Sequence, residues 1–142
     1  MKRKLNKKLF RKIRDKIARD GAKGAYDQGT FGRNSDQAPC GTAACIAGWA
    51  CLMTGELTLR GLIRIGDNGD TDRIVKRAKR VLGLTIKEAD HLFTGSPGDD
   101  GFGDAWPEPY KSQWERVGSP KARANVAIRY LNHIIETGKV LE

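Results

Sequence analysis

The chain has 142 residues, of which 39% are hydrophobic and 30% are charged, and it carries a formal net charge of +9. This length suits one compact domain, and the content of Leu, Ile and Val argues against wholesale disorder. No apolar run approaches the roughly 20 residues that cross a bilayer, and the basic start lacks the apolar stretch of a secretory signal. We therefore expect a cytoplasmic protein.

The positive charge is concentrated at the N-terminus. Residues 1–20 hold ten basic side chains against Asp15 and Asp20, a local net charge of +8, so the rest of the chain has a net charge of only +1. A second, smaller basic cluster consists of Arg73, Lys76, Arg77, Lys79 and Arg80. The high isoelectric point therefore comes mainly from one segment.

Apolar periodicity predicts a mainly helical fold. A stripe repeating every fourth residue predicts an amphipathic helix over about residues 2–19, a basic N-terminal arm to a single helical domain formed by residues 21–142. Residues 43–54 are almost all apolar or small, which predicts a buried helix at the centre of the core, with Thr42 as its N-cap and Gly55 just after its last turn. Residues 57–65 fit a strand or a helical turn equally well.

Three further helices have clear end signals. A helix is predicted over about 72–82, and one over about 86–94 begins with a capping box formed by Thr85 and Glu88. The last helix runs from about 120 to 137, because Ser119 precedes a proline at the first helical position and Gly138 ends the pattern. About five helices in one domain are expected in all.

The segment between the last two of these helices is rich in Gly, Asp and Pro. Residues 95–109 are expected to form a long loop, with Trp106 as its buried anchor, and a short helical turn is expected over about 112–117. Trp49 and Trp106 are predicted to be buried, and Trp114 to be more exposed.

The densest motif is Cys40-Gly41-Thr42-Ala43-Ala44-Cys45-Ile46-Ala47-Gly48-Trp49. Together with Leu92-Phe93 and Trp106-Pro107, this segment resembles a family of small, uncharacterised bacterial and phage proteins that share a C-G-T-x-x-C-x-A-G-W segment followed by L-F and W-P landmarks. The resemblance covers about residues 27–138 and implies a shared fold and an origin in a bacterial cell or a phage-infected host. It assigns no catalytic residue to this chain.

The cysteines can be interpreted either as a reactive site or as structural thiols. Cys45 at the start of a helix, with Cys40 just upstream, is where a reactive thiolate would be stabilised, which suggests a thiol-dependent enzyme. However, no His or Asp lies near them in the sequence to act as base and orienter. The chain also lacks zinc-knuckle spacing. We expect Cys45 and Cys51 to be buried, slowly reacting structural thiols, Cys40 and Cys45 to lie close together, and no metal or cofactor to be bound.

The helices predicted at 72–82 and 86–94 have the length of a helix-turn-helix. The second of them has an acidic balance, which argues against its insertion into a DNA groove. An ordinary helical corner is the favoured interpretation.

The basic N-terminal helix is the best functional candidate. It can lie along nucleic-acid phosphates, contact an acidic protein surface or remain a solvated face, whereas a membrane surface is less favoured because its apolar stripe is narrow and lacks Trp. The leading hypothesis is a non-enzymatic accessory protein that binds nucleic acid or a nucleoprotein complex. The alternative is a protein–protein module, such as a virion component or an inhibitor of a host complex, that uses this helix and the Trp106 loop. The predicted nucleic-acid-binding residues are Lys7, Lys8, Arg11, Lys12, Arg14, Arg73 and Arg77.

Overall fold

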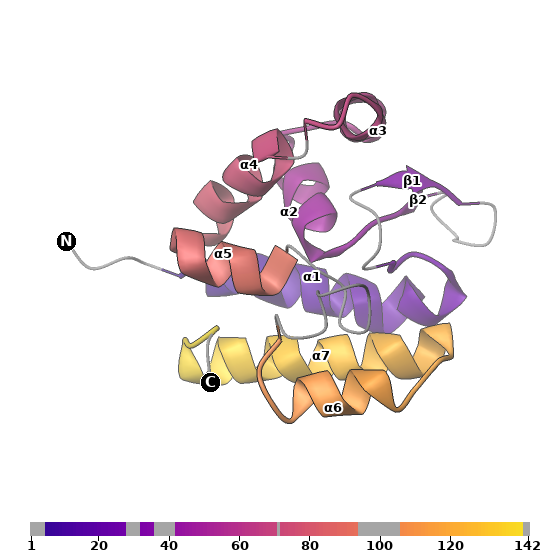
Figure 1. Ribbon diagram of the computed structural model, residues 1–142, viewed down its shortest axis with the longest axis vertical. Coiled ribbons are helices and arrows are strands. Elements are labelled where there is room, and N and C mark those ends of the chain that lie inside the picture. The colour runs from indigo at the N-terminus through magenta and orange to yellow at the C-terminus, as the bar shows by residue number, and fades with distance from the viewer. Residues whose placement is uncertain (1–4, 28–31, 36–41, 71, 94–105, 141–142) are drawn as a thin grey trace.

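The computed structural model describes residues 5–27, 32–35, 42–70, 72–93 and 106–140. Within these ranges the chain forms seven α-helices, one short 3-10 helix (η1, Gly21–Lys23) and one two-stranded hairpin. The buried residues of these elements form one continuous hydrophobic core. The predicted mainly helical single domain is therefore confirmed (Figure 1).

The two long helices, α1 (Lys7–Asp20) and α7 (Pro120–Thr137), lie side by side, and α1 also contacts α2 and α4 on its other side (Figure 1). Phe10, Ile13 and Ile17 of α1 are fully buried. Because the apolar stripe of α1 lies inside the common core, this helix is an integral part of the domain and not a detachable arm. The sequence predicts that this helix starts near residue 2. This is wrong, because Leu5 and Asn6 precede the helix; residues 2–4 lie outside the described residues.

Helix α2 (Ile46–Thr54) is buried along most of its length, as predicted for residues 43–54. Its predicted start is wrong, because Thr42–Ala43 form strand β2, antiparallel to β1 (Arg33–Asn34). Thr42 is therefore not the N-cap. Cys45 takes this place, and its Sγ accepts the N–H of Gly48 at 3.5 Å. Gly55 follows the last turn with a φ of +76°, in the left-handed region that glycine favours.

Of residues 57–65, which the sequence left open between strand and helix, residues 59–65 belong to helix α3 (Leu59–Asp67) and none forms a strand. The hydroxyl of Thr58 caps this helix by accepting the N–H of Gly61 at 3.1 Å. Leu62 and Ile65, one turn apart, are its buried residues. A local cap and a one-sided apolar face thus favour a helix over the alternation of a strand.

Helices α4 (Asp72–Leu82) and α5 (Ile86–Phe93) form a corner at Gly83, which has a φ of +74°. The predicted capping box is confirmed: Glu88 accepts the N–H of Thr85 at 2.9 Å, and Thr85 accepts the N–H of Glu88 at 3.1 Å. The predicted end of α5 at residue 94 lies outside the described residues.

An aromatic cluster joins α7 to the short helix α6 (Tyr110–Glu115), which starts two residues earlier than predicted. Trp106 is buried, as predicted, and its ring centroid lies 5.0 Å from that of Trp114 and 5.1 Å from that of Tyr130. The prediction that Trp114 is the exposed tryptophan is wrong, because its side chain packs edge-on against Trp106 and only 2% of its surface is exposed. The predicted loop residues 95–105 lie outside the described residues.

Candidate nucleic-acid interface

The start of α1 meets the end of α4 at Asn6. The Asn6 side chain caps α1 by accepting the N–H of Leu9 at 3.1 Å, and its Nδ2 donates to the carbonyl of Val81 at 2.9 Å. Its backbone N–H donates to the carbonyl of Leu82, also at 2.9 Å. Asn6 therefore provides hydrogen-bond partners for a backbone N–H in the first turn of α1, which has no partner within the helix, and for two carbonyls at the end of α4. This junction holds the two helix ends, 75 residues apart in sequence, in fixed register.

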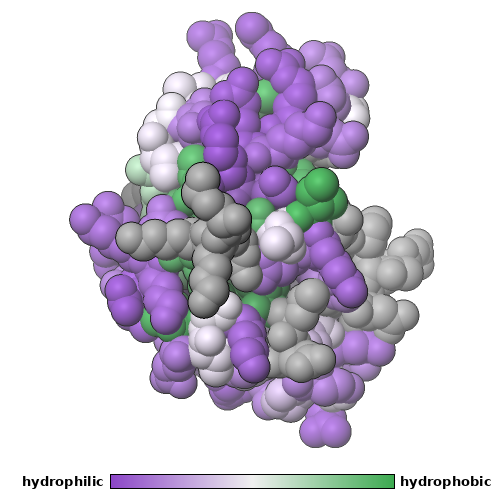
Figure 2. All heavy atoms as spheres, turned by 90° about the vertical axis from the view of Figure 1, so that its left-hand side faces the viewer, coloured by the Kyte–Doolittle hydropathy of each residue, from purple (hydrophilic) through white to green (hydrophobic). Residues whose placement is uncertain are grey.

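The junction brings basic residues from both clusters to one place. Lys7 and Lys8 of α1 lie with Arg80 of α4 around an open groove, together with the junction residues. Figure 2 views the molecule from the side on which α1 begins; the upper part of this face is largely hydrophilic, and hydrophobic patches lie beside the grey atoms in the middle. The two basic clusters seen in the sequence thus meet at the α1–α4 junction.

The outer face of α4 continues this positive surface. Arg73, Lys76, Arg77 and Arg80 follow the spacing i, i+3, i+4 and i+7, which places them on one face of a helix, and they line an open groove together. At 1.5 Å per residue, the row extends about 10 Å along the helix axis. We call Lys7, Lys8 and these four residues the basic junction surface.

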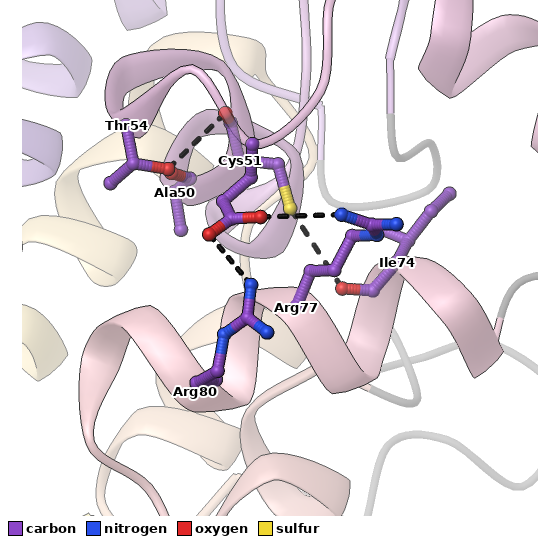
Figure 3. Close-up of polar contacts among 7 residues, drawn as sticks. Ala50, Cys51, Thr54, Ile74, Arg77 and Arg80 are labelled. Carbon is purple, nitrogen blue, oxygen red and sulfur yellow. Dashed lines mark hydrogen bonds and ion pairs between the residues drawn. The ribbon is translucent and has the colours of Figure 1, made fainter.

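Two carboxylates offset part of this charge. Glu56 pairs with Arg77 at 3.2 Å and with Arg80 at 2.7 Å (Figure 3), and Asp70 lies 3.9 Å from Arg73. The hydrogen bond from Arg80 is the main cause that lowers the pKa of Glu56, so this carboxylate is ionised at neutral pH. Six basic side chains against two carboxylates leave four positive charges in excess. Lys8 and Lys76 are exposed and form no ion pair with a described residue.

The remaining predicted residues of α1 lie elsewhere on the helix. Arg11 and Lys12 are exposed, whereas Arg14 contacts Asp15 and donates to the side chain of Asn132 on α7 at 3.0 Å. Arg14 therefore braces α1 against α7 and is not part of the basic junction surface. Further along, Lys16 pairs with Asp20 at 2.9 Å and lies 5.1 Å from the ring centre of Trp49.

The cysteines have the properties expected of structural thiols. Cys45 and Cys51 are both buried, and burial raises the pKa of Cys45 to about 12 and that of Cys51 to about 11. Burial thus outweighs the effect of the helix start at Cys45, as predicted. Cys40, and with it the predicted closeness of Cys40 to Cys45, lies outside the described residues. The burial and raised pKa values of Cys45 and Cys51 do not support either of them as a thiolate nucleophile.

Metal-ligating side chains do not cluster in the described part of the chain, where no group of three or more His, Cys, Asp or Glu is placed to hold a metal ion. Among the same residues, no helix is long and apolar enough to span a membrane.

Two residues of the site were not among the predicted ones. Asn6 is recognisable in the sequence as a cap residue before a helix, but nothing local shows that it also binds the end of α4. Glu56 gives no local signal, because its partners lie 21 and 24 residues further along the chain.

The chain matches no protein-family model, no curated protein and no solved structure. The resemblance of its Cys40–Trp49 segment to small bacterial and phage proteins therefore remains an expectation. The basic junction surface is the structural feature that indicates a function.

Proposed function

We propose that this protein is a non-enzymatic accessory protein that binds nucleic acid through the basic junction surface. The observation that carries the proposal is the Asn6 junction, which unites two basic clusters that are separate in the sequence. Six basic side chains on two rigidly joined helices form a surface to which a phosphate backbone is complementary.

The expected mode of binding is contact with the phosphate backbone, without strong sequence preference. Arg73, Lys76, Arg77 and Arg80 lie on one helix face, and the acidic balance of α5 makes that helix a poor reader of base edges. If the four excess charges neutralise about four phosphates of duplex DNA, log K should fall with log salt concentration at a slope of about −3.6. Binding should therefore be tight at low salt and weak at high salt.

Point substitutions test this surface without removing α1, whose buried face the fold requires. In the test variant, Lys8→Gln is combined with Lys76→Gln. The matched control combines Lys23→Gln with Lys121→Gln, which changes the net charge equally at exposed positions beyond the far end of α1. Binding to a labelled mixed-sequence duplex is measured by fluorescence anisotropy, and thermal melts confirm that both variants are folded.

The test variant should bind at least about tenfold more weakly than the wild type at about 0.1 M salt, because each lost phosphate contact removes a counterion-release contribution. The control should lose much less. Equal losses in the two variants would show that binding depends on net charge alone and not on this surface, and a wild type that does not bind would refute the proposal.

A second candidate function, contact with a protein partner, is favoured by Ile86. Among the described residues this is the one large hydrophobic side chain that is exposed, with 70% of its surface accessible. It lies with Val75 and Ala89 along a groove between α4 and α5, beside Lys76 and Lys79. Trp106, by contrast, is buried, so its ring offers no contact surface.

The partner hypothesis predicts that a specific protein co-purifies with the wild type at high salt and is lost in an Ile86→Ser variant. Because Ile86 is exposed, this substitution should leave the melting temperature nearly unchanged. Equal recovery of the same protein with the folded variant would exclude this groove as the contact.

A further inference from the structure

Glu56 is held over α4 by the way in which α2 ends. Gly55 turns the chain in the left-handed conformation, and the N–H of Leu57 then donates to the carbonyl of Cys51 at 3.3 Å. The thiol of Cys51 contacts the carbonyl of Ile74 on α4 at 3.8 Å, so the same turn of α2 is packed directly against α4 (Figure 3). The position of Glu56 relative to α4 is therefore set by the backbone and the core.

Both carboxylate oxygens of Glu56 are used. Oε1 accepts from Arg80 and Oε2 accepts from Arg77, two arginines nearly one helical turn apart on the same face of α4 (Figure 3). A phosphodiester also shares one negative charge between two oxygens, and guanidinium groups bind carboxylates and phosphates with the same donor geometry. The carboxylate thus occupies the position in which one phosphate group of a nucleic acid would fit.

The geometry points to Arg77 and Arg80 as a phosphodiester clamp that Glu56 fills in the unbound protein and that a backbone phosphate takes over when nucleic acid binds. This inference rests on the proposed function. In the unbound state Glu56 keeps the two guanidinium groups together, and in the bound state its carboxylate gives up at least one of them to the phosphate.

The exposure of the three side chains makes this exchange feasible. The Arg80 side chain is 67% exposed, that of Arg77 is 36% exposed and that of Glu56 is 24% exposed, so all three are in contact with water. Ion pairs in such positions are weak, because water and salt screen them. Arg77 and Arg80 also line an open groove with Arg73 and Lys76, which Glu56 does not line, so a phosphate that takes an arginine from Glu56 on the side of this groove would lie beside Arg73 and Lys76. The phosphate therefore gains partners that Glu56 does not contact.

The test compares Glu56→Gln with Glu115→Gln. Both substitutions remove one negative charge, but Glu115 is an exposed residue of α6, away from the basic junction surface. The probe is again a mixed-sequence DNA duplex, measured over a range of salt concentrations. If Glu56 competes with a phosphate, Glu56→Gln should bind about eightfold more tightly than Glu115→Gln at about 0.1 M salt, and its salt slope should be steeper by about 0.9, because the surface then has one more uncompensated positive charge to neutralise phosphate.

A double-mutant cycle shows whether the gain acts through the clamp. In a background of Arg77→Gln combined with Arg80→Gln, the advantage of Glu56→Gln over Glu115→Gln should disappear. Persistence of the full gain in that background would overturn the assignment of these two arginines.

The possible failures are distinguishable. A wild type that does not bind DNA contradicts the proposed function itself. If the wild type binds and the Lys8/Lys76 variant is weakened, but Glu56→Gln binds no better than Glu115→Gln, the clamp inference alone is wrong. Weaker binding by a folded Glu56→Gln variant would also overturn it, because Glu56 would then position the arginines while they hold the phosphate.

Discussion

Replacing Phe10 by alanine tests whether α1 belongs to the core. Phe10 is fully buried, on the face of α1 that packs into the common hydrophobic cluster. Removing such a ring costs about 3–5 kcal/mol through lost burial and the cavity left behind. For a domain of 142 residues, an unfolding entropy of about 2.1 cal/mol/K per residue sums to about 300 cal/mol/K, so this loss lowers the melting temperature by about 10–17 °C.

The measurement is a thermal melt followed by circular dichroism, with Arg11→Ala as the control. Arg11 is the exposed neighbour of Phe10, so the control keeps the helix and changes only its solvated side. It should shift the melting temperature by no more than about 2 °C, which corresponds to the roughly 0.5 kcal/mol typical of surface substitutions. If Phe10→Ala had the same melting temperature as Arg11→Ala, α1 would be an arm on the surface, and deleting residues 1–20 would leave the fold intact.

Three further outcomes follow from the buried and paired side chains. Trp49→Ala should lower the free energy of unfolding in urea by about 3–5 kcal/mol, because the buried ring also donates to the carbonyl of Ala25 at 2.9 Å; an unchanged denaturation midpoint would contradict its place in the core. The raised pKa values of Cys45 and Cys51 predict slow labelling of both by iodoacetamide at about pH 8 in the folded protein and fast labelling in denaturant; rapid labelling of the native protein would show an activated thiol. The hydrogen bond from Lys16 lowers the pKa of Asp20 below its ordinary value of 3.8, so Asp20 stabilises the fold above that pH and loses this contribution as the pH falls through its folded-state pKa. Asp20→Asn should therefore be less stable than the wild type near neutral pH, and the difference should shrink in acid melts below about pH 3.8; a constant difference would argue against this pair.

The helix ends that depend on local chemistry could be predicted from the sequence. The capping box at Thr85 and the Ser119–Pro120 start need only residues within one turn, and both are present as expected. The start of α2 could not be predicted in the same way. Thr42 is a good cap residue by itself, but pairing with Asn34 in the hairpin draws it into a strand and shifts the cap to Cys45.

The long-range features of the site also lie beyond local patterns. The burial of Trp114 results from packing against Trp106 and Tyr26, which neighbouring residues in the sequence do not reveal. The two basic clusters could be recognised from the positions of Lys and Arg along the sequence. Their union at Asn6 depends on a contact across 75 residues, for which one sequence holds no periodic signal.

The salt dependence of DNA binding by the Lys8→Gln/Lys76→Gln variant tests the basic junction surface most directly. Two of about four phosphate contacts are removed, so the slope of log K against log salt concentration should fall in magnitude from about 3.6 in the wild type to about 1.8. The Lys23→Gln/Lys121→Gln control should keep the wild-type slope. Identical slopes in the wild type and both variants would show that the joined ends of α1 and α4 are not where the phosphates bind.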